Sequence, residues 1–159
     1  MSERTRRAAE RAVGLALGLV LLRSAAAHVG NPHHFLSAVY SYQVVGPEVG
    51  RLAAAALPTV HVVLALCLLS GWWARGAYLA AGAVFAGFGA AQAAALYRGL
   101  DISCGCFGAA DSLPVGPGTL AVAGGCALAA VVGGVLARPA GQGTNGGEPC
   151  DAPTGPGSL

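Results

Sequence analysis

Four runs of apolar residues constrain most strongly what this chain can fold into. They cover about residues 12–27, 52–70, 74–97 and 115–136. The last three reach the ~20 residues that a helix needs to cross the hydrocarbon core of a bilayer. Of the 159 residues, 55% are hydrophobic and only 10% charged, which is not typical of a soluble domain. The sequence therefore predicts an all-α integral membrane protein, a four-helix bundle.

The first run has two interpretations. A polar segment with Arg4, Arg6, Arg7 and Arg11 precedes it, as in a secretory signal peptide. Arg23 interrupts the run, however, and three further spans follow, which favours a retained first helix. We expect residues 1–11 to form a cytoplasmic segment, residues 12–137 the four-helix domain and residues 138–159 a disordered, Gly/Pro-rich cytoplasmic tail.

Arginine distribution predicts the orientation of the bundle. Four spans leave both termini on one side, and most of the arginines lie there: Arg4, Arg6, Arg7, Arg11, Arg75 and Arg138. The other side has Arg51 and Arg98, with Arg23 near that end of its helix. The positive-inside rule places the termini in the cytoplasm, and the loop after the third span outside.

Other local patterns refine this picture. In the first outer loop, Phe35, Val39, Tyr42 and Val45 recur at helical spacing after Asn31-Pro32, which predicts a short interfacial helix. Glycines such as Gly14 and Gly18 predict close helix packing, and Pro58 predicts a kink in the second span. The net charge of +2 and the scattered arginines argue against nucleic-acid binding.

Cys104 and Cys106, which a single glycine separates, are the residues most suited to chemistry. A disulfide between them closes a very small ring, which glycine permits and which is strained. Strain raises the reduction potential, so the pair suits thiol-disulfide exchange. Arg98 would favour a thiolate here, whereas Asp101 would oppose it. A static disulfide, or a metal site completed by His28, His33 or His34, is the alternative.

The remaining cysteines are expected to be inert. Cys67 and Cys126 lie inside spans and are interpreted as small buried hydrophobic residues. The alternative is a second pair that relays electrons to a membrane quinone, although Cys67 lies near the cytoplasmic end of its helix. Cys150 is expected to be a reduced thiol in the cytoplasmic tail.

Two polar residues inside spans are candidates for a role, because polar groups are costly in the bilayer. Arg23 either extends toward the interface or contributes to the bundle. His61, near the middle of its helix, is either a neutral histidine bonded to a neighbouring helix or a proton carrier beside the thiol chemistry.

From about Gly14 to Leu136 the chain resembles the MauE/DoxX group of prokaryotic redox-associated membrane proteins, the family of the methylamine utilisation protein MauE. The resemblance rests most on Arg98-Gly99 leading to Cys104-Gly-Cys-Phe-Gly108. Weaker matches are Asn31-Pro32 before Phe35, Tyr42 before Pro47, and Leu57-Pro58. Relatives commonly have a lysine near the position of His28, and a glutamate where this chain has His61.

The resemblance implies support of disulfide formation or reduction in exported proteins, beside a thioredoxin-like or disulfide-rich partner, with Cys104 and Cys106 as the redox pair. We therefore expect a thiol-disulfide oxidoreductase component of the cell membrane that matures an exported redox protein. Its main rival is a non-catalytic scaffold that docks a redox partner. The sequence identifies no substrate and does not prove a role in methylamine metabolism.

Overall fold

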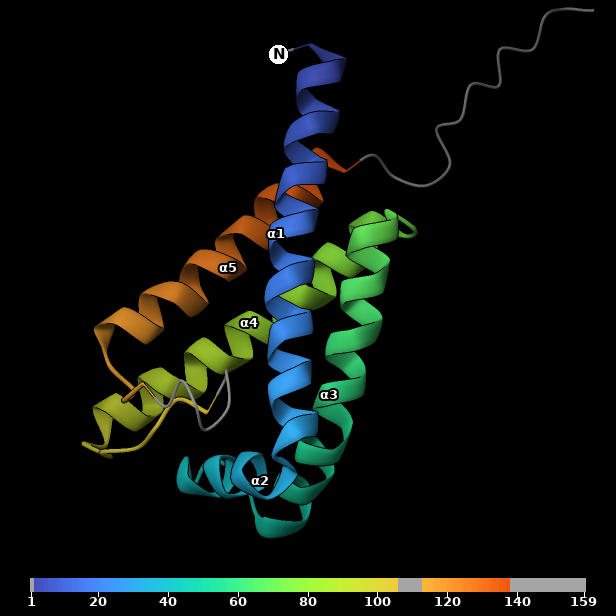
Figure 1. The fold of residues 1–159 in the computed structure, drawn as a ribbon. Helices are drawn as coiled ribbons and strands as arrows, with labels where there is room; N and C mark the ends of the chain where they lie inside the picture. Colours follow the sequence, from blue (N-terminus) through green and yellow to red (C-terminus); the bar gives the residue numbers. More distant parts are fainter. Residues whose placement is uncertain (1, 106–112, 138–159) are drawn as a thin grey trace, which may run out of the picture.

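The computed structural model describes residues 2–105 and 113–137, and these residues form an all-helical fold (Figure 1). In chain order the helices are α1 (Glu3–Gly30), α2 (Pro32–Ser41), α3 (Pro47–Ser70), α4 (Ala74–Tyr97) and α5 (Pro117–Leu136). All but α2 are long and apolar enough to cross a membrane. The predicted four-helix membrane bundle is confirmed.

Local sequence explains where the long helices begin and end. The Ser2 hydroxyl caps α1 by accepting from the Thr5 amide, so the polar N-terminal segment is helical as well. Pro47 and Pro117 begin α3 and α5, since proline suits the first helical turn. Gly71 ends α3 with a φ of 72°, a left-handed conformation that glycine adopts easily.

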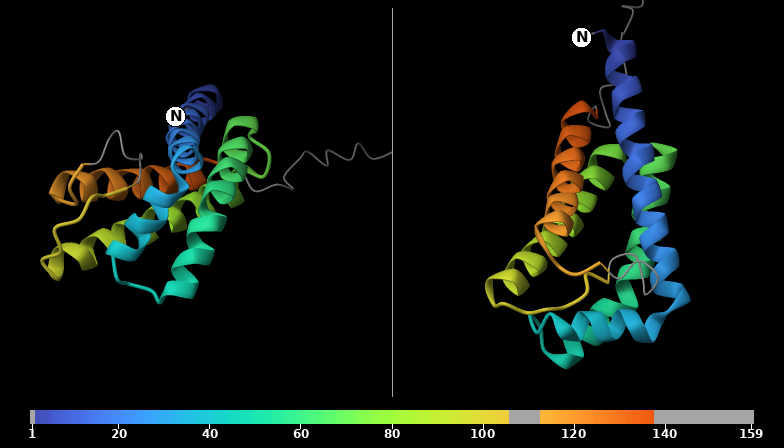
Figure 2. Two further views of the ribbon diagram at one scale, coloured as in Figure 1. Left: turned by 60° about the horizontal axis from the view of Figure 1, so that its bottom comes forward. Right: turned by 60° about the vertical axis from the view of Figure 1, so that its left-hand side comes forward.

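The short helix of the first loop is confirmed, but it is shorter than the spacing predicted. It ends at Ser41, so Tyr42 and Val45 lie beyond it. The reason is that Gln43 takes a left-handed φ of 49°, and the Arg98 guanidinium donates to the Tyr42 and Gln43 carbonyl oxygens. In Figures 1 and 2, α2 lies across the ends of the longer helices, opposite the amino terminus.

The long helices pack in two main pairs, α1 with α3 and α4 with α5, and α1 also contacts α5. Tyr78 of α4 lies at the centre of the core and is 2% exposed. Gly14 and Gly133 lie directly against it, where a Cβ atom would overlap its side chain. The expected role of small residues in packing holds here, whereas Gly87, Gly124 and Gly125 have open space beside them.

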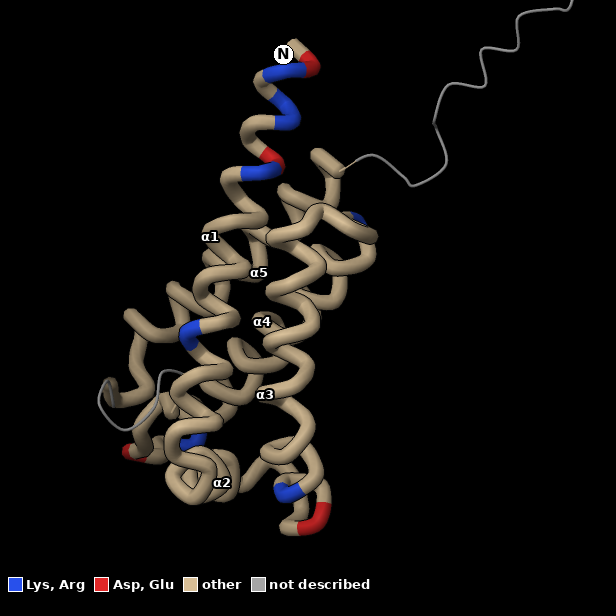
Figure 3. Tube along the Cα trace, turned by 45° about the vertical axis from the view of Figure 1, so that its right-hand side comes forward, with Lys and Arg blue, Asp and Glu red and all other residues tan. Residues whose placement is uncertain are grey.

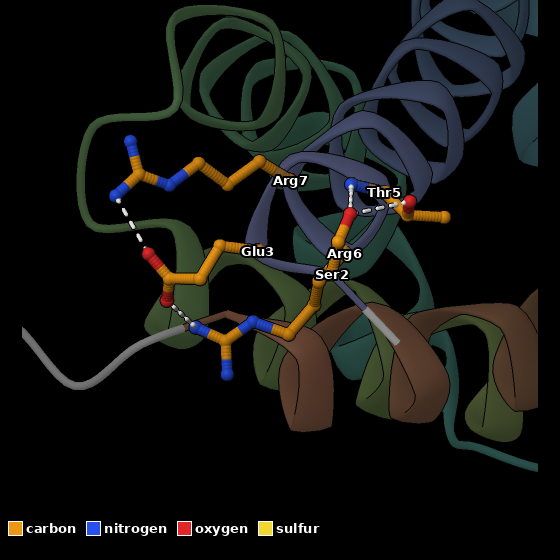
Figure 4. A network of polar contacts seen from close by, with 5 residues as sticks. All are labelled: Ser2, Glu3, Thr5, Arg6 and Arg7. Carbon is orange, nitrogen blue, oxygen red and sulfur yellow. Dashed lines mark hydrogen bonds and ion pairs between the residues drawn. The ribbon is translucent and has the colours of Figure 1, made fainter.

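Most of the charged residues lie toward the two ends of the bundle (Figure 3), and exposed aromatic residues lie there as well. At the amino-terminal end, Glu3 pairs with Arg6 and Arg7 (Figure 4). Trp72 and Trp73 are largely exposed in the turn between α3 and α4, and Tyr97 is exposed at the opposite end of α4. Tryptophan and tyrosine at helix ends are typical of membrane interfaces. Arg23 points away from the core, with an exposed side chain.

Candidate functional site

The segment that carries Cys104 is fixed at its base by backbone pairing. Ser103 and Pro114 form an isolated antiparallel bridge. On its two sides the Cys104 amide donates to the Leu113 carbonyl at 2.9 Å, and the Val115 amide donates to the Ile102 carbonyl at 2.8 Å. Cys104 therefore has a defined backbone position between α4 and α5, although it lies outside any helix.

Position 105 needs a glycine for two reasons, its backbone conformation and its closeness to α2. Its φ of 69° is left-handed, and a Cβ atom there would lie 2.7 Å from the Cβ atom of Ala38 on α2. A side chain at this position would be strained and would push against α2. The glycine between the two cysteines thus lets the loop lie directly on α2.

Tyr42 and Arg98 connect the cysteine segment to the first loop. The Tyr42 hydroxyl donates to the Cys104 carbonyl at 3.0 Å. Arg98 in turn donates to the carbonyl oxygens of Tyr42 and Gln43 at 3.1 and 3.2 Å, and to the Gln43 side chain at 3.2 Å. Arg98 therefore supports the residue that holds Cys104, a role that sequence reasoning missed.

The structure places only some of the predicted cysteine-site residues. Cys104 is half-buried, whereas Cys106 lies outside the described residues, and so does Cys150. Asp101 is exposed. Its predicted opposition to a thiolate, like the predicted support from Arg98, stays a prediction.

His61 is buried among the helices, beside His28. Each histidine is 1% exposed, and their ring centroids are 5.7 Å apart. His28 stacks on Phe35 of α2 at 3.6 Å and shares a hydrogen bond of 3.1 Å between its Nε2 and Ser24 Oγ. His61 lies 5.9 Å from the Phe88 ring. The histidines thus connect α1, α2, α3 and α4 at the level where α2 packs.

A cavity of about 390 Å³ adjoins both His61 and Cys104. Its walls come from all four long helices and from the cysteine segment, and apolar side chains such as Leu21, Phe85 and Val122 form most of them. The polar residues among its walls are Ser24, His61, Gln92, Cys104, Thr119 and Cys126. The cavity occupies the half of the bundle that lies toward the cysteine segment.

Two polar side chains of this cavity have buried atoms that form no hydrogen bond within the described part of the chain. Both ring nitrogens of His61 and Oε1 of Gln92 are buried with no hydrogen bond. Gln92 is 1% exposed. Buried polar groups without partners are uncommon and costly. Sequence reasoning identified His61 but missed Gln92, although an amide inside the apolar run of residues 74–97 was a usable signal.

Cys67 and Cys126 differ in their surroundings. Both are partly buried and pack against the core, and neither forms a disulfide with another described residue. Cys126 is part of the cavity wall with Cys104, whereas Cys67 is not. Pairing of Cys67 with Cys126 as an electron relay therefore gains no support from the cavity.

Metal binding gains no support from the residues that the structure describes, which do not include Cys106. Among residues 2–105 and 113–137, no three His, Cys, Asp or Glu side chains gather as a metal site would require. His33 is exposed on α2, and His28 Nε2 is already bonded to Ser24.

Comparison with known proteins completes the description. No curated protein and no solved structure matches the chain. One family model does match, that of the methylamine utilisation protein MauE, over residues 6–137. The match includes the cysteine segment between α4 and α5 and all four long helices, of which only α1 lacks its first residues. The chain therefore belongs to the MauE family of membrane proteins.

Proposed function

We propose that this protein carries out thiol-disulfide exchange with an exported protein, through Cys104 and Cys106 on the outer face of the cell membrane. The observation that carries the proposal is that hydrogen bonds fix the position of the Cys104 backbone. Two backbone hydrogen bonds and the Tyr42 hydroxyl fix it, while Gly105 has a left-handed φ. Such a backbone favours two neighbouring thiols that meet repeatedly in one geometry, which exchange chemistry requires.

The orientation belongs to the same proposal. The amino-terminal end carries the arginine cluster, and the cysteine segment lies at the opposite end of the bundle (Figure 3). Under the positive-inside rule the termini are cytoplasmic, and Cys104 faces the oxidising side. In the exchange, one cysteine attacks a partner disulfide as a thiolate, forms a mixed disulfide and releases one partner thiol. The other cysteine then attacks the mixed disulfide and frees the second partner thiol.

A redox titration of the purified protein tests this proposal. In nanodiscs equilibrated with glutathione buffers, the Cys104–Cys106 pair should convert reversibly between dithiol and disulfide within the range of known exchange proteins, about −120 to −270 mV. Mass spectrometry after alkylation gives the oxidised fraction. The matched control is a variant that keeps the pair and lacks Cys67, Cys126 and Cys150, which should titrate identically.

Two results would contradict the proposal. A pair that remains oxidised below about −300 mV is a structural disulfide, as in a scaffold that only docks a partner. If the titration disappears when Cys67 and Cys126 are removed, the redox change belongs to those thiols and not to the Cys104–Cys106 pair.

A further inference from the structure

We infer that the cavity beside His61 and Gln92 binds a lipid-soluble quinone, which exchanges electrons with the cysteine pair. This inference rests on the proposed function for its redox part, but the binding site stands on geometry alone. Three observations carry it: the position and size of the cavity, the unpartnered polar atoms of His61 and Gln92, and the presence of Cys104 in the cavity wall.

Position and size indicate a ligand from the lipid phase. The walls are transmembrane helices with mostly apolar side chains, so an ion or a sugar would lose its hydration without compensation. A cavity of about 150 Å³ holds one benzene ring. The cavity of about 390 Å³ therefore has room for a substituted quinone ring and the beginning of its isoprenoid tail.

The unpartnered atoms of His61 and Gln92 suit a quinone and its quinol. A neutral histidine has one N–H donor and one nitrogen acceptor, and an amide has both a carbonyl and an NH₂ group. The neutral His61 ring can donate to a carbonyl oxygen of a quinone or accept from a hydroxyl of the quinol, and the unpartnered Oε1 of Gln92 can accept from a hydroxyl of the quinol. An acyl chain would leave these buried polar atoms unpaired, which makes it the poorer occupant.

Cys104 completes the arrangement, because it belongs both to the cavity wall and to the redox pair. Closing the Cys104–Cys106 disulfide breaks two S–H bonds, forms one S–S bond and releases two electrons and two protons. The quinone takes up both electrons and both protons at its oxygens and leaves as quinol. The reverse reaction reduces the disulfide at the expense of quinol.

The test titrates decylubiquinone into nanodiscs that contain the full chain, with empty nanodiscs as the blank. Saturable retention of about one quinone per chain is expected. His61→Leu and Gln92→Leu should each weaken retention by about three- to tenfold, the value of one neutral hydrogen bond. The matched control is His33→Leu, which changes an exposed histidine of α2 outside the cavity wall and should bind like the wild type.

Retention no greater than in empty nanodiscs, or equal retention by wild type, His61→Leu and Gln92→Leu, would overturn the site and leave an acyl chain as its occupant. Thermal unfolding of each variant verifies that the fold survives the substitution.

A second measurement separates this inference from the proposed function. The Cys106→Ser variant keeps Cys104 in the cavity wall but cannot close the disulfide, so it should retain decylubiquinone like the wild type and fail to reduce it. Pre-reduced wild type should convert about one quinone per chain, read by ultraviolet absorbance. Binding without reduction by the wild type would overturn electron transfer and leave the binding site intact. Thiol exchange without quinone binding would overturn the site and leave the proposed function intact.

Discussion

Tyr78 and His61 are both polar residues buried inside transmembrane helices, yet their surroundings differ. The Tyr78 hydroxyl donates to the Glu10 carbonyl at 2.6 Å, and glycines of α1 and α5 lie against the side chain. His61 has no hydrogen bond to any described residue, and a cavity adjoins it. Tyr78 is thus closely packed and hydrogen-bonded, whereas His61, toward the cysteine segment, has a cavity beside it and unused polar atoms.

This difference separates structural polar residues from candidate ligand-binding ones. A buried polar group with its partner in place stabilises one packing arrangement, and its removal should destabilise the protein. A buried polar group without a partner costs free energy in the empty protein, so its retention in a folded chain needs another reason. Disturbing the surroundings of Tyr78 should therefore cost stability, whereas removing the His61 side chain should cost little or none.

The largest effect is expected at Gly133, beside Tyr78. The Gly133→Ala methyl group would overlap the Tyr78 ring, which cannot move far because it is buried, so we expect a loss of about 3 kcal/mol in the free energy of unfolding. Gly125→Ala, the same change in the same helix with open space beside it, should be neutral or slightly stabilising. Steric-trapping or thermal unfolding in detergent measures both. Equal effects would refute the close packing around Tyr78.

An intermediate effect is expected at Gly105, where the cysteine segment meets α2. Gly105→Ala should cost about 2 kcal/mol locally through strain at positive φ and contact with Ala38, and should shift the pair toward the dithiol in a fixed glutathione buffer. Gly99→Ala, also at positive φ but without a neighbour within 4 Å, should leave the ratio nearly unchanged.

Adding Ala38→Gly to Gly105→Ala removes the contact, and should recover part of the wild-type ratio. A double variant as impaired as Gly105→Ala would show that the contact with α2 does not position the cysteines.

The smallest effect on stability is expected at His61, beside the cavity. His61→Leu removes two unpartnered buried nitrogens, so the free energy of unfolding without quinone should stay within about 1 kcal/mol of wild type, or rise. Thermal unfolding in quinone-free nanodiscs measures it. A loss of several kcal/mol would mean that His61 has a structural partner after all, and would remove the contrast with Tyr78.

Much of this fold was predictable from the sequence because the bilayer requires long apolar helices, and α4 spans the predicted residues 74–97. The end of α2 was not predictable from spacing. It depends on Arg98, which is 55 residues from Gln43 in the chain and binds its carbonyl. Local periodicity contains no information about such a distant donor.

The candidate site was predictable only in part. Cys104 and His61 stand out by residue type, and the motif from Arg98 to Gly108 marks the cysteine segment, including Gly105. The cavity, the proximity of His61 to His28 and the presence of Gln92 in the cavity wall depend on how four helices pack, which no single segment encodes. The cost of an unpartnered atom becomes visible only when every neighbour is placed.

The central claim, an exchanging cysteine pair on the outer face, is tested most directly in intact cells with a membrane-impermeant thiol reagent. The chain would carry only Cys104 and Cys106, and a second chain with only Cys150 would serve as the cytoplasmic control. We predict that the pair is labelled from outside after mild reductant and is protected before it, whereas Cys150 reacts only after permeabilisation. Labelling of the pair only after permeabilisation, or a Cys104–Cys106 disulfide that mild reductant does not reduce, would contradict the account.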